Sequence, residues 1–190
     1  MGFLGNVHKA FNPIKLLTDG LGGWVGNIAR IATTVISGLA SGRPINQILK
    51  DVLKDVVALA IKMAITAFTG GTAGLFINQL VDKMQGILGD VAGKVLASGL
   101  SKPIAAAAAN TIQGFAKSLS TDVVRKQISD VVLSATGLPN EDAYLDPKRI
   151  NQEKLREGLN GILLPRIDAS SWNAPSATYS MGRDEFVTRR

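Results

Sequence analysis

The stretch PINQILKDVLKDVVALAIKMAITAF, residues 44–68, decides the fold that we predict for this chain. Its apolar residues recur at intervals of three and four, which places them along one side of an α-helix. Lys50, Asp51, Lys54 and Asp55 fall outside that apolar stripe. Because burying these charges in lipid is costly, we expect a central amphipathic helix that does not cross a bilayer alone.

Helical spacing continues on both sides of this stretch, so we predict an all-α fold of amphipathic helices separated by Gly and Pro breaks. The best delimited helix has Ser120 or Thr121 as its N-cap and Gly137 as its C-terminal glycine. Asp146-Pro147 is expected to cap the last helix, after a linker. Besides the central helix, helical segments are predicted at residues 3–11, 13–19, 24–40, 74–100, 103–117, 122–136 and 147–160, with the linker at 140–146.

Two glycine clusters interrupt the helical pattern, GLGGWVG at residues 20–26 and TGGT at residues 69–72. The first resembles a phosphate-binding loop, but Val25 occupies the sixth position of GxGxxG and no strand precedes it. Flexible joints are the better interpretation, because glycine adopts backbone conformations closed to other residues. We therefore expect hinges at Gly22, Gly23, Gly70 and Gly71.

A row of small residues follows the second joint: Gly86, Gly89, Gly93 and Ala97 recur at intervals of three and four. Each glycine inside a helix costs about 1 kcal/mol relative to alanine, so a repeated row indicates close approach of another backbone. That backbone either belongs to the central helix of the same chain or to a second copy. The second interpretation makes these four residues an oligomer seam.

Composition narrows the classes of function. The chain has 190 residues and is 46% hydrophobic, enough for a real core, yet only 5% aromatic, which disfavours a small-molecule pocket lined by rings. It has no cysteine and a single histidine, His8, so neither a thiolate metal site nor a Ser-His catalytic pair is indicated. No HExxH, GxSxG, P-loop or EF-hand motif occurs. We expect no catalysis, cofactor or metal.

The formal net charge of +6 is spread along the chain, without a polybasic block. This pattern argues against a groove that recognises nucleic acid by sequence. The first residues, MGFLGNVHKAFNPIKLL, lack the basic leader and long apolar core of a secretory signal peptide.

The chain changes character towards its C-terminus: no Glu precedes Glu141, and the helical period is lost from Pro165 onward. We interpret the chain as a Gly/Ala-rich helical assembly domain at 1–137, a linker and amphipathic helix at 138–164, and an extended docking arm at 165–190. A free disordered tail is the competing interpretation of the last part. The proposed anchors of the arm are Trp172, Tyr179 and Phe186.

In composition and layout, the apolar region 1–137 resembles the small, helical, Gly/Ala-rich internal virion proteins of tailed bacteriophages, called ejection proteins. That resemblance implies a structural protein that forms homo-oligomers, contacts other virion proteins, and moves with the genome into the host envelope to line a conduit. A host membrane is then a further expected partner, and the virion the expected location. Two other classes fit the same features: a soluble helical scaffold or adaptor, and a membrane-active pore-forming toxin.

Overall fold

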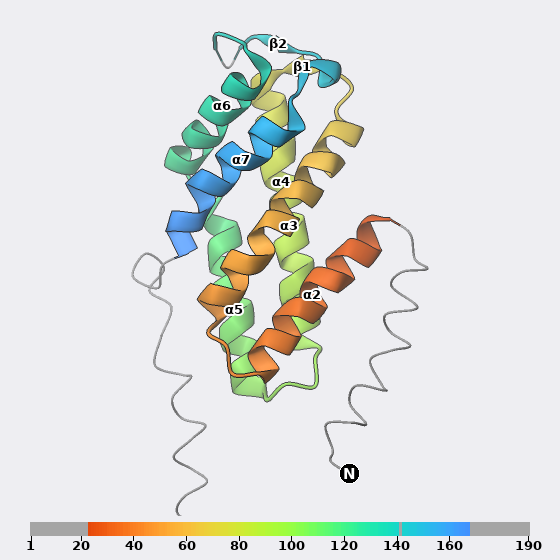
Figure 1. Ribbon diagram of the computed structural model, residues 1–190, viewed down its shortest axis with the longest axis vertical. Coiled ribbons are helices and arrows are strands. Elements are labelled where there is room, and N and C mark those ends of the chain that lie inside the picture. The colour runs from red at the N-terminus through yellow and green to blue at the C-terminus, as the bar shows by residue number, and fades with distance from the viewer. Residues whose placement is uncertain (1–22, 141, 168–190) are drawn as a thin grey trace, which may run out of the picture.

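The structure is a computed structural model that describes residues 23–140 and 142–167. Over these residues the fold is all-α, as predicted, with a small two-stranded clip at one end (Figure 1). The α-helices are α2 (Trp24–Ala40), α3 (Ile45–Ala67), α4 (Ala73–Leu96), α5 (Lys102–Ser118), α6 (Asp122–Thr136) and α7 (Gln152–Leu163). The short elements are β1 (Gly71–Thr72), β2 (Tyr144–Leu145), and the 3-10 helices η1 (Pro147–Arg149) and η2 (Leu164–Ile167). The helices predicted at 3–11 and 13–19 lie outside the described residues.

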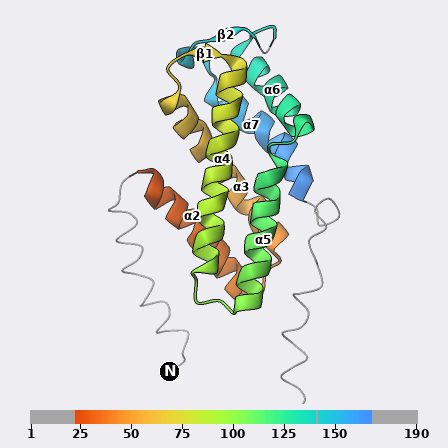
Figure 2. The ribbon, with the colours of Figure 1, turned by 180° about the vertical axis from the view of Figure 1, so that it is seen from behind.

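Helix α3 occupies the centre of the bundle, as its apolar stripe predicts. It packs against α2, α4 and α7, so its neighbours surround it on several sides. Figure 1 shows α3 between α2 and α7, and Figure 2 shows α4 and α5 covering the reverse side. Val56, Val57 and Ala60, in the middle of α3, are fully buried. The helix therefore serves as the common packing surface of the bundle.

Helix α6 begins and ends where the sequence predicts. Thr121 precedes the helix in an extended conformation, and Asp122 lies in its first turn. Gly137 ends it with φ +70°, a left-handed conformation in which a side chain would strain the backbone. Gly137 thus ends the helix as predicted, whereas the Thr121 hydroxyl makes no hydrogen bond to the first turn and donates to the Ser118 carbonyl.

A two-stranded clip, absent from the sequence prediction, ties distant parts of the chain together. β1 pairs antiparallel with β2, with Gly71 opposite Leu145 and Thr72 opposite Tyr144. The Ala73 N–H also donates to the Ala143 carbonyl, at 3.1 Å. The linker predicted at 140–146 therefore contains a strand, which is too short to show a period of two.

The predicted start of the last helix is wrong. Asp146 accepts a hydrogen bond from the Lys148 N–H, but this cap starts only the three-residue η1. The backbone is extended at Ile150, and Asn151 then accepts from the Glu153 and Lys154 N–H groups. Helix α7 consequently begins at Gln152, because Asn151 satisfies two of its unpaired first-turn donors.

The hydrophobic core is continuous across the compositional change near residue 138. Leu145, Leu155, Leu159 and Leu163 are fully buried and belong to the same cluster as the apolar residues of α2 to α6. Ile167, at the end of η2, is fully buried as well. The residues after 137 thus complete the core of the preceding helices.

Candidate self-association face

Helix α4 presents one uncovered face, which we call the outer face of α4. It consists of Leu75, Asp82, Gly86, Gly89, Gly93, Leu96 and the C-cap residue Ala97, all exposed. From Asp82 to Leu96 the intervals alternate between four and three residues. Such a series averages 3.5 residues, the period that keeps a helix face turned towards a partner helix. Figure 2 shows α4 on the surface of the bundle, with α2 on one side and α5 on the other.

The glycines of this face have open space beside them in the described structure. A Cβ built at Gly86, Gly89 or Gly93 meets no heavy atom within 4 Å. The interpretation of this row as packing against the central helix is therefore wrong, since α3 lies against other faces of α4. The predicted oligomer seam, in contrast, is exposed along its whole length, including Ala97.

Large apolar side chains flank the glycines. Leu75 is 54% exposed and Leu96 is 51% exposed, although both lie on a helix whose other apolar residues are buried. Isolated surface leucines are common, but here two of them share a face with three open glycines. The outer face of α4 therefore has a large apolar side chain near each end, and the glycines between them carry no side chain.

Among the described residues, Gly38 and Gly158 make close helix contacts that the sequence pattern does not single out. A Cβ at Gly38 on α2 would lie 2.8 Å from Ile48 Cδ1 on α3. A Cβ at Gly158 on α7 would lie 2.5 Å from Val131 Cγ1 on α6. A signal for Gly38 was present, because it follows Val35 by three residues on the buried side of α2.

The predicted hinge residues have different surroundings. Gly22 lies outside the described residues, whereas Gly23 precedes α2 with φ +145° and no atom within 4 Å of a built Cβ. Gly70 and Gly71 also have positive φ, +112° and +151°, but Gly71 belongs to β1 and pairs with Leu145. Gly70 directly precedes β1, and Tyr144 Oη would lie 2.7 Å from a Cβ at Gly70. Movement at these joints stays a prediction.

The predicted arm anchors Trp172, Tyr179 and Phe186 lie outside the described residues. The first residues of the predicted arm, 165–167, belong to η2, which packs against α3 and α7. This short segment follows α7 directly and carries the core as far as Ile167.

Surface depressions offer no converging set of catalytic groups in the described part of the chain. The depression between α3 and α7 is lined by Lys62, Glu153 and Arg156, all exposed and of mixed charge, with Gln152 and apolar atoms of α3. Depressions beside α6 likewise mix exposed Asp, Lys and Arg side chains. Residues 23–140 and 142–167 contain no group of three or more His, Asp or Glu placed to hold a metal ion.

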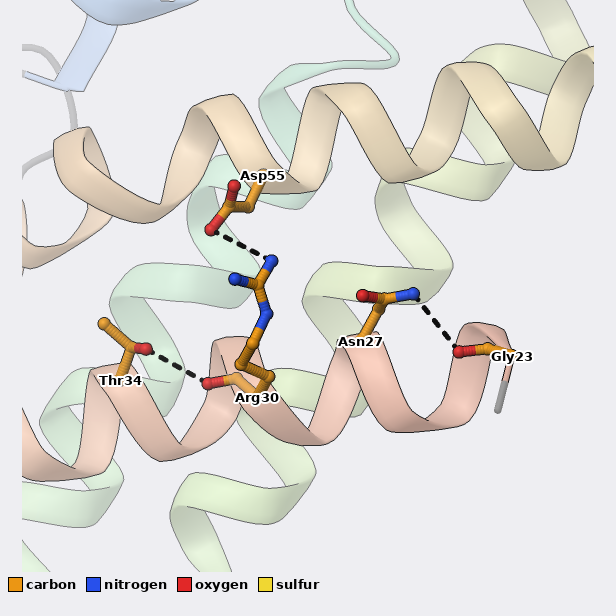
Figure 3. Close-up of polar contacts among 5 residues, drawn as sticks. All are labelled: Gly23, Asn27, Arg30, Thr34 and Asp55. Atoms are coloured by element: carbon orange, nitrogen blue, oxygen red, sulfur yellow. Dashed lines mark hydrogen bonds and ion pairs between the residues drawn. The ribbon is translucent and has the colours of Figure 1, made fainter. Parts of the chain in front are cut away.

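The polar contacts of α2 are structural. Arg30 pairs with Asp55 of α3 at 3.5 Å, as Figure 3 shows. In the same view the Thr34 hydroxyl donates to the Arg30 carbonyl, and the Asn27 side chain donates to the Gly23 carbonyl (Figure 3). These groups bond to their own helix or to its neighbour, so they do not form a ligand site.

No protein-family model, curated protein or solved structure matches this chain. Among the helices of the described residues, none combines the length and apolar character needed to cross a membrane. The candidate site therefore rests on the geometry of the outer face of α4.

Proposed function

We propose that this chain is a non-enzymatic structural protein that forms homo-oligomers through the outer face of α4. One observation carries the proposal: Gly86, Gly89 and Gly93 are exposed on one helix face, and a Cβ built at each would meet no heavy atom within 4 Å. Glycine costs about 1 kcal/mol per helix position relative to alanine. Three such positions weaken α4 without improving the packing of the described bundle, and close approach of another backbone would offset that cost.

The flanking leucines supply an attractive surface for such a contact. Burying a leucine side chain contributes about 1.5–3 kcal/mol when it starts fully exposed. Leu75 and Leu96 are about half exposed, so each would gain roughly half of that on coverage. The glycines between them allow the axis of a second helix to come nearer than large side chains permit.

The setting we propose is the virion of a tailed bacteriophage. The chain resembles ejection proteins in its Gly/Ala-rich helical character, and the all-α fold supports this comparison. In the proposed mechanism, identical copies associate with other virion proteins, leave the particle with the genome, and line a conduit across the host envelope. If this face meets the same face of a second copy, the contact is two-fold and gives a dimer, so a closed ring requires the outer face of α4 to meet a different surface of the next copy.

The self-association is tested with Gly89→Leu in the full chain. Gly161→Leu on α7 is the matched control, because Gly161 is also exposed, helical and free of atoms within 4 Å. We expect sedimentation equilibrium to show a dissociation constant at least about tenfold weaker for Gly89→Leu, a loss of about 1.4 kcal/mol. Far-UV circular dichroism should be the same for both variants and the parent chain.

Two results would contradict the proposal: a parent chain that stays monomeric at every concentration measured, or equal association of Gly89→Leu and Gly161→Leu. The virion assignment is tested separately, by imaging the native particle that contains the chain. Repeated, symmetry-related copies are expected there, and their absence from the particle would contradict that assignment.

A further inference from the structure

The joint between α5 and α6 differs from the other joints between the described α-helices, because it contains neither Gly nor Pro. It consists of Leu119, Ser120 and Thr121. The other joints each contain at least one glycine, in chain order Gly42, then Gly70 and Gly71, then Gly99, then Gly137. No helix-breaking residue therefore forces the chain to turn between α5 and α6.

The backbone of this joint stays close to helical. The N–H groups of Leu119, Ser120 and Thr121 donate to the carbonyls three residues earlier, at 3.2, 3.2 and 3.3 Å, as in a 3-10 turn. Leu119 has right-handed helical φ and ψ, whereas Thr121 is extended, with ψ 144°. The Ser120 and Thr121 hydroxyls donate to carbonyls in the last turn of α5. A change in few backbone dihedrals would therefore join α5 and α6 in one helix.

The apolar stripes of α5 and α6 explain why the chain turns at all. Ile112 is buried on α5 and Ile128 is buried on α6, sixteen residues further along the chain. At 3.6 residues per turn, this separation places them about 160° apart around a single straight helix. The turn brings both stripes onto one core, so packing against the bundle maintains it. Straightening the joint would rotate the α6 stripe away from its own core.

Residues 122–167, which we call the C-terminal unit, form one connected part of the fold. Within it, α6 and α7 pack closely, with Gly158 lying against Val131. Figure 1 shows both helices at the end of the bundle that carries the clip. The chain enters this unit once, through the joint at 119–121. The unit can therefore leave α2 to α5 and return without threading through a loop.

The seam between the C-terminal unit and the bundle contains polar atoms that docking leaves unpaired. Open depressions lie between α3 and α7 and between α4 and α6. Ser129 lies four residues from both Arg125 and Leu133, which line the second depression, and Asn160 lies four residues from Arg156, which lines the first. The Ser129 hydroxyl and the Asn160 side-chain oxygen are buried without a hydrogen-bond partner among the described residues. Because unpaired buried polar atoms oppose docking, they favour separation of the unit.

A separated C-terminal unit would leave a large apolar surface uncovered. Leu155, Leu159 and Leu163 of α7 are fully buried, in one cluster with apolar residues of α3 and α4. Exposing these side chains to water is unfavourable, so the open unit requires an apolar surface of the same shape. A second copy of the chain provides that surface on its own α3 and α4, and it restores every contact that the opening breaks.

We infer that two copies of this chain exchange their C-terminal units, with residues 119–121 as the hinge. Each unit packs on α3 and α4 of the partner, and each clip forms between β1 of one copy and β2 of the other. This contact uses surfaces that are buried in the monomer, so it goes beyond the proposed function and does not depend on the outer face of α4.

The exchange is tested by cross-linking in the full chain, which has no native cysteine. Thr72 and Tyr144 face each other across the clip, and both are exposed. Partner Cα atoms in an antiparallel pair lie about 4.5–5.5 Å apart, which a disulfide can bridge. The single variants Thr72→Cys and Tyr144→Cys are mixed in urea, refolded together and oxidised. A 72–144 disulfide can then form only between two copies.

The matched control is a mixture of Thr72→Cys with Val123→Cys, because Val123 is also exposed on the C-terminal unit but lies outside the clip. We expect peptide mass spectrometry to find the 72–144 disulfide at least about tenfold more often than the 72–123 disulfide, since only the clip brings Cα atoms within bridging distance. The yield should rise with chain concentration, because exchange competes with the closed monomer. Equal yields in the two mixtures at every concentration would overturn the exchange.

The role of the joint is tested with the double substitution Ser120→Ala and Thr121→Ala. It removes two side-chain hydrogen bonds that hold the turn and raises helix propensity at the joint. Thr111→Ala with Ser134→Ala replaces the same residue types inside α5 and α6 and is the matched control. We expect the joint variant to give the 72–144 disulfide at several-fold lower concentration than the control. Equal behaviour of the two variants would overturn residues 119–121 as the hinge.

Failure of the exchange and failure of the proposed function are distinguishable. Gly89→Leu alters the outer face of α4 and should leave the 72–144 disulfide between copies unchanged. Loss of that disulfide in Gly89→Leu would overturn the exchange as a separate contact. A parent chain that self-associates without forming the disulfide between copies would overturn the exchange and leave the proposed function standing.

Discussion

Gly158 on α7 lies so close to Val131 on α6 that a Cβ at position 158 would come within 2.5 Å of Val131 Cγ1 and 3.3 Å of Val131 Cβ. Val131 is short and β-branched, so it has little freedom to move away. Three residues further along the same helix, Gly161 is exposed and has no atom within 4 Å. One helix therefore contains a glycine required by packing and a glycine that its surroundings leave free.

We predict that Gly158→Ala lowers the free energy of unfolding by about 1–3 kcal/mol, because a methyl group would overpack the contact between α6 and α7. Gly161→Ala should instead raise it by up to about 1 kcal/mol, through helix propensity alone. Urea denaturation of both variants measures the difference. The same gain in both would show that α7 lies further from α6 than the structure places it.

This contrast shows what sequence periodicity can and cannot supply. The boundaries of α2, α3 and α6 follow from apolar spacing and from the glycine and proline residues near their ends, which act within a few positions. The role of a glycine depends on which helix lies against it, and that partner is distant in sequence. Gly89 and Gly158 both interrupt amphipathic helices, yet only the assembled bundle shows that Gly158 is covered and that Gly89 is open to a partner outside residues 23–140 and 142–167.

The clip and the start of α7 were missed for a related reason. Two-residue strands have too few positions to show alternation, and their pairing joins Gly71 to Leu145 across more than seventy residues of chain. At α7, both Asp146 and Asn151 are good capping residues, and Asp146-Pro147 is the stronger local signal. The extended backbone at Ile150 separates the two turns, and burial of Ile150 in the core accounts for the break.

We predict that Asn151→Ala destabilises the protein more than Asp146→Ala does. Asn151 accepts hydrogen bonds from two first-turn N–H groups of α7, and loss of an N-cap typically costs about 0.5–2 kcal/mol. Asp146 caps only the three-residue η1, so its loss should cost less. Chemical denaturation of the two variants shows whether the last helix starts at Pro147 or at Gln152. A larger loss for Asp146→Ala would indicate a continuous helix from residue 147.

The Arg30–Asp55 pair between α2 and α3 should contribute little to stability. The side chains are 63% and 51% exposed, and exposed pairs typically couple by about 0–1 kcal/mol. We predict a coupling energy below about 1 kcal/mol from the double-mutant cycle of Arg30→Ala and Asp55→Ala, and a further decrease at high salt. A coupling of several kcal/mol, or one that salt leaves unchanged, would mean that the pair is shielded from water by a part of the protein beyond the described residues.

Removing the side-chain hydroxyl of Ser129 on α6 is expected to stabilise the protein. Its side chain is 1% exposed, and its hydroxyl has no hydrogen-bond partner among the described residues. A buried hydroxyl without a partner costs about 1–3 kcal/mol, so Ser129→Ala should stabilise the protein despite removing a polar group from its interior. Ser134→Ala, at an exposed position of the same helix, should show only the smaller gain from helix propensity. Thermal denaturation of both variants measures the difference, and a loss of stability in Ser129→Ala would reveal that this hydroxyl is bonded in solution, through water or through a rotamer that reaches the preceding turn.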